Sequence, residues 1–420
     1  MKKINNNWQE KPFWKLTTKK SINDQDHLEL LSVYLNKGVI KFSDIEQKRT
    51  NVTSEDKSKY QRVDSGDLVM NNQQSWRGSV GISKMTGIVS PAYLVFCISE
   101  ELNPAFAHYL FRDKYMVDQY ILSSRGVGSI QRNLHYPSLR DIKVPVPPKE
   151  EQELIAKYLE KKSKQITSLI EKIDRKIKLY EEQKSALINQ YLTKGLELNV
   201  EMIDTGIDWI GEIPKHWKIT KLKYLSKINV QYGLNIESDF YCESGIRFLR
   251  ITDIKHDGSL KKDGGVYLNE SNVPCEYILK KGDLLFSRTG GTVGKSTLIE
   301  SSEELMSFAG YLVRFSFESF DLSVFVNLFS KSSAFWYWIN LQITQSTIQN
   351  VNGEKYSNLV IPLPPVNEIK EINSKLKKKL TIFDQIIQKE YIRKNYLIEY
   401  RQSLISSVVT GKNRITEDMI

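Results

Sequence analysis

Two short stretches of this sequence carry residue types that could do chemistry. Residues 290–296, GGTVGKS, resemble a phosphate-binding loop, in which backbone amides, a lysine and a hydroxyl hold the phosphates of a nucleotide. That loop needs four residues between its glycines, whereas three separate Gly290 from Gly294. The apparent counterpart at 78–83 has an isoleucine where the lysine stands, so a structural turn explains both stretches and a nucleotide site explains only one.

The second stretch, Asn103-Pro104-Ala105-Phe106, resembles the Asn-Pro-Pro-aromatic tetrapeptide of amino-methyltransferases. No glycine-rich or S-adenosylmethionine loop accompanies it, and its counterpart at 321–324 shares only a residue that can cap a helix. The 5 histidines and 3 cysteines have no metal-ligand spacing. The sequence therefore predicts no catalytic nucleophile, metal site or acid/base pair in this chain.

The chain repeats itself over half its length. Residues 144–148, VPVPP, return as residues 361–365, IPLPP, 217 residues later, and the same distance carries Thr193 onto Thr410. Such a period indicates duplication, and two copies of one element suggest a target in two parts.

About fifty residues without proline follow each proline-rich hinge, and their apolar residues recur at three- and four-residue spacing. This pattern predicts two long helices, over 149–194 and 367–410. Two core helices of separate bundles are the alternative. Because neither stripe can stay exposed to water, we expect the helices to pair with each other as an antiparallel rod. The stripes are Ile155, Leu159, Ile166, Leu169, Ile173, Ile177, Tyr180, Leu187 and Tyr191, then Ile372, Leu376, Leu380, Phe383, Ile387, Leu397, Leu404 and Val408.

The expected fold class is α+β, with two tandem α+β domains joined by two long helices that pair as an antiparallel coiled coil, in a pseudo-two-fold internal repeat. The expected segments are 1–143, 144–195, 196–360 and 361–420. Several stretches of the two blocks correspond, and one helix follows in each block. The matched stretches are 13–17 with 216–220, Gly66-Asp67 with Gly282-Asp283, 78–81 with 291–294, 93–95 with 311–313, and the helices 103–115 with 321–339.

Each block closes on a polar loop, at 124–134 and 344–353, in which glycine, amides and hydroxyls are joined by arginine in the first copy. Such side chains contact phosphates or base edges, and an ordinary solvated loop is the alternative. Trp76 could stack on a base or pack in a core. The candidate contact residues are Arg77, Arg125, Gln131, Arg132 and Asn133 in the first block, and Arg288, Lys295, Gln349, Asn350 and Asn352 in the second.

Composition limits the number of cores, the kind of partner and the cellular compartment that the chain can have. At 420 residues and 40% hydrophobic content the chain can bury two or three cores, and its net charge of +10 suggests a polyanion partner or merely a lysine-rich composition. No apolar run approaches twenty residues, and the opening MKKINNNWQEK lacks an apolar segment, so we expect neither a membrane span nor a signal peptide. The three separated cysteines fit a reducing cytoplasm.

Four stretches together resemble the specificity subunit of type I restriction-modification enzymes over essentially the whole chain. They are the lead-in GIDWIGEIPKHW at 206–217, the repeated Gly-Asp-Leu strand starts, the hinge and helix VPVPPKEEQELIAKYL at 144–159, and the closing KSALINQYLTKG at 184–195. The first block lacks the lead-in, and the second hinge continues with NEIK at 367–370 where the first has EEQE.

This resemblance implies two target recognition domains that each read half of a split, asymmetric double-stranded DNA sequence. The paired helices would bind two methyltransferase subunits, and two restriction subunits join some complexes. No cofactor is expected in this chain; the complex would use S-adenosylmethionine, and ATP and magnesium when a restriction subunit is present. The expected partner-binding residues are Ile155, Leu159, Ile166, Leu169, Ile173, Leu376, Phe383, Ile387 and Leu397.

Other functions remain open at this point. The chain could serve a methylation-only or related restriction system, or it could be a scaffold that binds proteins without contacting DNA. An enzyme that uses the stretch at 290–296 is a third possibility.

Overall fold

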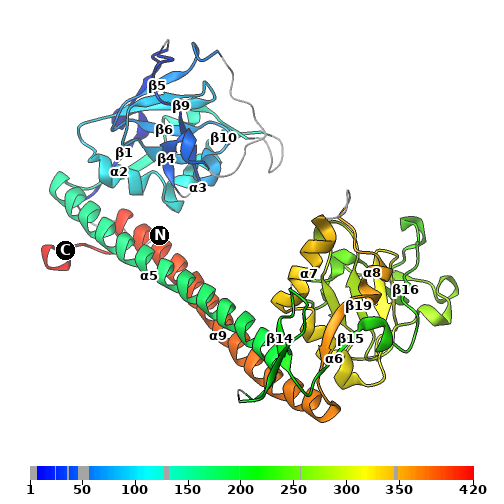
Figure 1. Cartoon of the computed structure of the whole chain (residues 1–420). Helices are drawn as coiled ribbons and strands as arrows, with labels where there is room; N and C mark the ends of the chain where they lie inside the picture. The colour runs from blue at the N-terminus through cyan, green and yellow to red at the C-terminus, as the bar shows by residue number, and fades with distance from the viewer. Residues whose placement is uncertain are drawn as a thin grey trace. The chain divides into compact units, whose positions relative to one another are not determined.

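In the computed structural model of this chain, the structure describes residues 7–23, 25–35, 37–45, 56–126, 132–197, 199–255, 257–344 and 349–420. Helices and short strands are mixed, as the sequence predicts, and two helices are long (Figure 1). The chain divides into two compact units. Unit 1 comprises Met1–Asp174 and Tyr391–Ile420, and unit 2 comprises Arg175–Glu390. Because this division cuts both long helices, the four-segment division expected from the sequence stays a prediction.

The long helices are α5 (Lys149–Asn189) and α9 (Val366–Val409). Each begins directly after two prolines. A residue that precedes a proline disfavours the helical backbone conformation, so the helix starts only after the second proline. At its far end α5 gives way to a π-helical turn, Gln190–Lys194, and then to Gly195 with a φ of 77°. The end of α9 is followed by Gly411, with a φ of 69°.

Parts of α5 and α9 pair within each unit. In unit 1 the Asp174 carboxylate accepts a hydrogen bond from the Lys394 ammonium at 2.6 Å. In unit 2 Lys184 and Asp384 form an ion pair. Ten residues separate Asp174 from Lys184 and ten separate Asp384 from Lys394, so the pairing is antiparallel and has the same register in both units.

Unit 1 holds a four-stranded antiparallel sheet in the order β2-β9-β6-β7, with smaller pairs β1-β12, β3-β4, β5-β8 and β10-β11. Its described strands are β1 (Gln9–Pro12), β2 (Thr17–Lys20), β3 (Leu31–Tyr34), β4 (Gly38–Lys41), β5 (Gln61–Val63), β6 (Leu68–Asn71), β7 (Val80–Ile82), β8 (Gly87–Val89), β9 (Tyr93–Ile98), β10 (Ser124–Arg125), β11 (Asn133–Leu134) and β12 (Lys143–Val146). The shorter helices are α1 (Phe13–Leu16), α2 (Pro104–Leu110), α3 (Lys114–Leu122) and α4 (Tyr136–Leu139).

Unit 2 holds the corresponding sheet β16-β22-β19-β20, a second sheet β18-β17-β21, and the pairs β13-β14 and β15-β23. Its described strands are β13 (Met202–Asp204), β14 (Glu212–Pro214), β15 (Lys218–Lys221), β16 (Gln231–Tyr232), β17 (Ile246–Leu249), β18 (Val266–Leu268), β19 (Leu284–Ser287), β20 (Ser296–Leu298), β21 (Met306–Phe308), β22 (Leu312–Phe315) and β23 (Val360–Leu363). The shorter helices are α6 (Phe320–Phe329), α7 (Ser333–Thr344) and α8 (Gly353–Ser357).

The register of the two four-stranded sheets corrects two sequence matches. Leu68 pairs with Ile82 as Leu284 pairs with Leu298, so Gly78 corresponds to Gly294 and not to Gly291. Both glycines have a positive φ, 94° and 85°, and follow the 3-10 turns Ser75–Arg77 and Gly290–Thr292. The match of 78–81 with 291–294 is therefore wrong, and so is the match of 93–95 with 311–313, because Tyr93 stands where Leu312 does. Similar residues in the two stretches suggested an alignment that is shifted, and the strand pairing reveals the correct one.

The opening match is wrong for the same reason. Gln9 pairs with Val146 as Lys218 pairs with Leu363, so Trp8, and not Trp14, corresponds to Trp217. Backbone hydrogen bonds support this alignment, since the Phe13 amide donates to the Ile142 carbonyl at 3.0 Å and the Leu222 amide donates to the Leu359 carbonyl at 2.9 Å.

Two helices, rather than one, follow the sheet in each block. Asp113 starts α3 by accepting a hydrogen bond from the Tyr115 amide at 2.9 Å. The hydroxyl of Ser332 accepts one from the Phe335 amide at 3.2 Å at the start of α7. The single helices expected over 103–115 and 321–339 are wrong because these short polar side chains cap a new helix within each stretch.

Each unit closes where the end of a long helix meets a tryptophan. In unit 2 a Cβ built on Gly195 would lie 3.1 Å from Cζ2 of Trp217. In unit 1 a Cβ on Gly411 would lie 3.4 Å from three ring carbons of Trp8. Both contacts need glycine, because the φ is positive and the indole lies directly above the backbone.

We expect Gly195→Ala to lower the unfolding midpoint of unit 2 and Gly411→Ala that of unit 1. A left-handed alanine costs about 1–2 kcal/mol, and at Gly195 the methyl group also collides with the indole. Denaturant unfolding with Trp217 or Trp8 as the probe measures the change. Gly291→Ala is the matched control, since nothing lies within 4 Å of its Cβ position. Equal midpoints for all three variants would contradict this explanation.

Candidate nucleic-acid interface

In unit 1 the turn after β6 is joined to the β10-β11 hairpin. The Leu134 amide donates to the Asn72 backbone carbonyl at 3.2 Å and to the Asn72 side-chain oxygen at 3.1 Å. Within the hairpin, Arg125 pairs directly with Asn133. The structure therefore brings Arg125, Arg132 and Asn133 beside the turn that carries Arg77.

Trp76 lies at the centre of this edge. Its ring has the Arg77 guanidinium carbon 4.5 Å from the ring centroid and that of Arg132 at 5.6 Å. Its indole N–H donates to the Gln73 carbonyl at 2.9 Å, which fixes the ring orientation. The ring is half-buried, so it is neither a core residue nor a free stacking platform. Gln131 lies outside the described residues.

In unit 2 Arg288 directly follows β19, as Asn72 directly follows β6 in unit 1. Its Nε donates to the Gly310 carbonyl at 2.9 Å, and its guanidinium carbon lies 5.1 Å from the Tyr232 ring centroid and 5.9 Å from that of Tyr311. The two tyrosines are 39% and 55% exposed. A cation held between two accessible aromatic rings is a surface that can stack on bases or contact a phosphate.

Three other candidate contact residues of unit 2 lie along the same edge as Arg288. They are Gln349, Asn350 and Asn352, and they differ in hydrogen bonding and burial. The Gln349 carbonyl accepts from the Gly290 amide at 3.1 Å while its side chain is exposed. Asn350 has a buried side-chain oxygen without a hydrogen-bond partner among the described residues. Asn352 caps α8 by accepting from the Lys355 amide at 2.8 Å, so its oxygen is already used.

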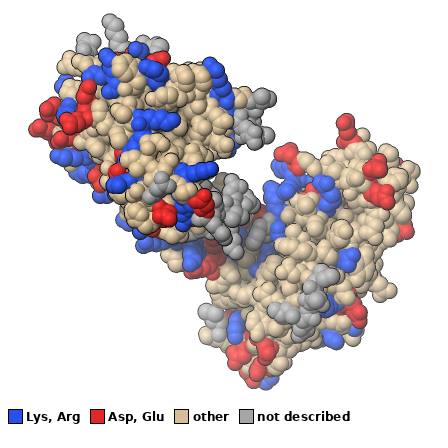
Figure 2. Space-filling view, turned by 90° about the horizontal axis from the view of Figure 1, so that it is seen from above, with Lys and Arg blue, Asp and Glu red and all other residues tan. Residues whose placement is uncertain are grey.

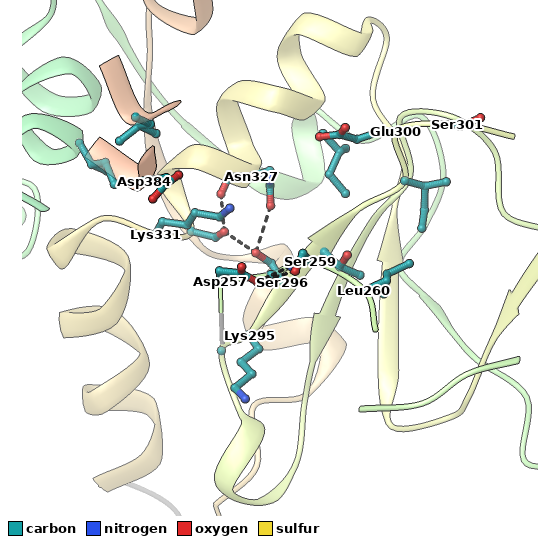
Figure 3. Close-up of a pocket in the computed structure, with 18 of the residues that line it drawn as sticks. Asp257, Ser259, Leu260, Lys295, Ser296, Glu300, Ser301, Asn327, Lys331 and Asp384 are labelled. Carbon is teal, nitrogen blue, oxygen red and sulfur yellow. Dashed lines mark hydrogen bonds between the residues drawn. The ribbon is translucent and has the colours of Figure 1, made fainter. Parts of the chain in front are cut away.

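Lys295 lies on the neighbouring strand connection, where its carbonyl accepts from the Ser287 amide at 2.8 Å. Its side chain points away from the cluster of Asp257, Lys331 and Asp384 (Figure 3). The stretch 290–296 forms a 3-10 turn followed by strand β20, whereas a phosphate-binding loop leads into a helix whose N-terminus faces the phosphates.

The two edges share one backbone frame. The Val351 amide donates to the Arg288 carbonyl at 2.9 Å, as the Leu134 amide does to Asn72. The Arg288 amide donates to the Tyr311 carbonyl at 3.1 Å, as the Asn72 amide does to Ala92 at 3.2 Å. Arg132 and Gln349 therefore occupy equivalent positions, as do Asn133 and Asn350. Sequence reasoning missed Tyr232 and recorded Tyr311 only as a strand start, because no local pattern places either beside Arg288.

The described residues offer no site for a metal. Within them, no group of three or more His, Cys, Asp or Glu side chains lies close enough to hold an ion. Lys and Arg form several separate clusters on the face shown in Figure 2, interrupted by neutral surface and by Asp and Glu. No helix in the described part of the chain is both long and apolar enough to cross a membrane.

Residues 15–179 match the family model of the type I restriction modification DNA specificity domain. The MjaVIII specificity subunit of Methanocaldococcus jannaschii is 24% identical over 316 residues, which cover 73% of this chain and 70% of the relative. The EcoKI specificity subunit of Escherichia coli is 25% identical over 313 residues, covering 71% of this chain and 62% of the relative.

Solved structures share the fold. A chain from a study of complex assembly and conformational transition in the type I R-M system aligns with a TM-score of 0.75 at 14% identity, covering 98% of this chain and 100% of that one. The HsdS subunit of Thermoanaerobacter tengcongensis aligns with a TM-score of 0.53 at 14% identity, covering 98% of each chain.

The family model and the relatives agree on a class of DNA specificity proteins. Residues 15–179 match the DNA specificity domain of this class, and over most of its length the chain is similar to specificity subunits of type I restriction-modification enzymes. Such subunits are generally non-catalytic.

Asn350 and Asn352 should respond differently to substitution. We expect Asn352→Ala to destabilise unit 2 by about 1 kcal/mol because α8 loses its cap, and Asn352→Asp to retain stability. Asn350→Ala should cost nothing, since it removes a buried oxygen that has no partner. Denaturant unfolding of the three variants measures this, and a larger loss for Asn350→Ala would contradict the assignment.

Proposed function

We propose that this chain is the DNA-reading subunit of a type I restriction-modification complex. Unit 1 contacts one half of a bipartite, asymmetric double-stranded target and unit 2 contacts the other. The matched edges carry this proposal. One hydrogen-bonded frame presents Arg132 against Trp76 in unit 1 and Arg288 against Tyr232 and Tyr311 in unit 2. An arginine side chain can form two parallel hydrogen bonds with a guanine or a phosphate, and the aromatic rings can stack on bases.

The finer architecture belongs to the same proposal. Two tandem α+β target recognition domains are joined by α5 and α9, which pair as an antiparallel coiled coil. The pair Lys176 and Glu390 in unit 2 supports this pairing, as do the rings of Tyr180 and Phe383, whose centroids lie 6.3 Å apart. The length of the paired helices, rather than a base contact, then sets the number of unread base pairs.

Two methyltransferase subunits dock on these helices, and two restriction subunits join where they are present. The seam residues Ile155, Leu159, Ile166, Ile173 and Leu376 are buried within their own units, and Phe383, Ile387 and Leu397 are half-buried. These residues therefore lie beneath the docking surface. The exposed apolar side chains that contact the partners are Leu169, which is 42% exposed, with Leu179, Ile382, Tyr396 and Tyr400.

The chemistry resides in the partners. The chain itself takes no cofactor, while the complex uses S-adenosylmethionine for adenine methylation, and ATP and magnesium when it cleaves DNA. Adenine methylation requires the base to leave the duplex, so the edges must bind a distorted duplex. The complex works in the cytoplasm, where host and foreign DNA are both accessible.

Exchanging the first block, residues 1–143, for that of another specificity subunit should change one half of the methylated sequence and leave the other half unchanged. Methylation mapping of DNA from cells that express the hybrid with its methyltransferase measures both halves. A change in both halves or in neither would contradict separate reading by the two units. DNA binding that is independent of this chain would favour the protein scaffold, and methylation without cleavage would favour a methylation-only system.

We expect Arg288→Lys to relax recognition in the half-site that unit 2 reads. A bidentate base contact is worth about 1–3 kcal/mol, and lysine keeps the charge but loses the fork. Competition binding by the complex, with half-site variants of the duplex, measures discrimination. Lys215→Ala is a control, since Lys215 pairs with the exposed Glu201 beside the β13-β14 pair, which is separate from the sheet that carries Arg288.

If Arg288 contacts only a phosphate, Arg288→Lys will discriminate like the parent. In that case Arg288→Ala will lower affinity on every sequence and reduce the salt dependence by about one unit. That result would contradict base reading by Arg288.

A further inference from the structure

Unit 1 contains a cavity that reaches from the turn of Trp76 to the long helix α9. Its volume is about 1110 Å³, and Trp76 and Arg77 line it together with residues of α3 and α9. A Cβ built on Gly78, directly after Arg77, would lie 3.6 Å from a methyl carbon of Val117, so α3 packs against the turn that carries these two side chains. The cavity is therefore continuous with the edge that is proposed to contact DNA.

Arg112 lines this cavity and is largely buried. One of its terminal nitrogens hydrogen-bonds to Nε2 of His108 at 2.9 Å, and its Nε is buried with no hydrogen-bond partner among the described residues. No carboxylate among those residues forms an ion pair with it. Burial and the nearby guanidinium of Arg112 lower the pKa of His108 to about 4, so His108 is neutral at physiological pH. The charge of Arg112 is therefore left without a paired carboxylate.

Arg401 adds a second guanidinium to the same cavity from α9. Burial lowers the pKa of the Arg112 guanidinium, and the nearby charge of Arg401 lowers it further. A terminal nitrogen of Arg401 donates to the Thr167 hydroxyl at 3.4 Å, and in the part of the chain that the structure describes Arg401 forms no ion pair. Two like charges that repel each other in one cavity are both stabilised when an anion lies between them.

The charges along the unit 1 cavity are positive on balance. Four cations and three carboxylates line it, and two of the carboxylates are already engaged. Asp118 pairs with Lys114 at 2.8 Å, and Asp113 caps α3 and accepts a hydrogen bond from the Ser406 hydroxyl at 3.3 Å. The charged groups that remain are the carboxylate of Glu399 and the guanidinium groups of Arg77, Arg112 and Arg401.

The equivalent cavity of unit 2 has the opposite balance, although a cation stands at the same place in the repeat. Lys331 lies two residues after the end of α6, as Arg112 does after the end of α2. Burial lowers the pKa of the Lys331 ammonium group, and three carboxylates oppose that shift. They are Asp257, Asp384 and Glu300 (Figure 3). Five carboxylates and three lysines line this cavity, so the buried cation of unit 2 has counterions and that of unit 1 does not.

We propose that the unit 1 cavity holds a phosphate group of the DNA backbone between Arg112 and Arg401, beside the half-site that the Trp76 edge contacts. This inference rests on the proposed contact of unit 1 with DNA. A buried guanidinium without a counterion is costly for a fold, and a phosphate supplies the missing charge. A guanidinium also donates two parallel hydrogen bonds to a phosphate, which fixes the position of the phosphate as well as neutralising its charge.

The place of the cavity favours a DNA phosphate over a free anion or a carboxylate of a protein partner. Trp76 and Arg77 form part of its wall, so a duplex bound at their edge brings its own phosphates to the cavity. Phosphate contacts fix the register of a duplex without reading its sequence, which leaves the bases to residues such as Arg132. The acidic cavity of unit 2 repels a phosphate, and Lys295, which also lines it, points away from the buried Lys331 (Figure 3).

The test uses the full chain in complex with its methyltransferase subunits, and duplexes that contain or lack the target. Arg112→Gln should lower the affinity for both duplexes by about tenfold and reduce the salt slope by about one, with discrimination between half-site variants unchanged. Arg401→Gln should reduce the slope in the same way, and it replaces Arg112→Gln if that variant does not fold. Arg112→Lys keeps the charge and should keep the slope. Lys331→Gln is the matched control and should leave the slope unchanged, because carboxylates already offset that charge.

Duplexes with single neutral methylphosphonate linkages locate the contact. In the half-site that unit 1 reads, which the exchange of the first block identifies, one such linkage should weaken binding by the parent chain about tenfold and leave binding by Arg112→Gln unchanged. Losses that multiply at every linkage would show that Arg112 contacts none of these phosphates and would overturn the inference.

Three other results would also overturn it. The first is an unchanged salt slope in both Arg112→Gln and Arg401→Gln, or an equal loss in Lys331→Gln. The second is weaker methyltransferase binding with unchanged DNA affinity, which would assign the cavity to a protein carboxylate. The third is thermal stabilisation of the parent chain, but not of Arg112→Gln, by inorganic phosphate while duplex affinity stays the same, which would identify a site for free phosphate. Failure of the parent complex to bind DNA would instead overturn the proposed function.

Discussion

Burial of the ends of the two long helices is the interaction on which the core of each unit depends. The end of α9, through Val408 and Val409, packs in the same core as Phe13 and Phe96 of unit 1. The end of α5 and the π-helical turn that follows it, through Ile188, Tyr191 and Leu192, pack in the core of unit 2. Each unit is thus completed by a helix that begins in the other, and burying each large apolar side chain contributes about 1.5–3 kcal/mol.

The long helices could be predicted because their pattern is local. Apolar spacing along α5 and the prolines before Lys149 and Val366 define a helix and its start without reference to the rest of the chain. Sheet register is not local, since it depends on which strands meet. For this reason the resemblance of Trp14 to Trp217 gave an alignment that the strand pairs of Gln9 and Lys218 overturn.

The candidate interface also contains residues that a local pattern predicts and residues that only the sheet brings together. Loop composition was enough to single out Arg77 and Arg132, and both lie against Trp76. It could not single out Tyr232, which lies 56 residues before Arg288 and reaches it because β16, β22 and β19 are neighbours in one sheet. Contacts that are assembled across a sheet leave no spacing in the sequence. Gln131 lies outside the described residues, so its place in the interface stays a prediction.

The two copies share a backbone frame and differ in the side chains that it presents. At the edges, the backbone frame around Asn72 and Arg288 is the same while the projecting side chains differ, as expected if one geometry of approach must read two unlike half-sites. A surface that reads different sequences gains from such divergence.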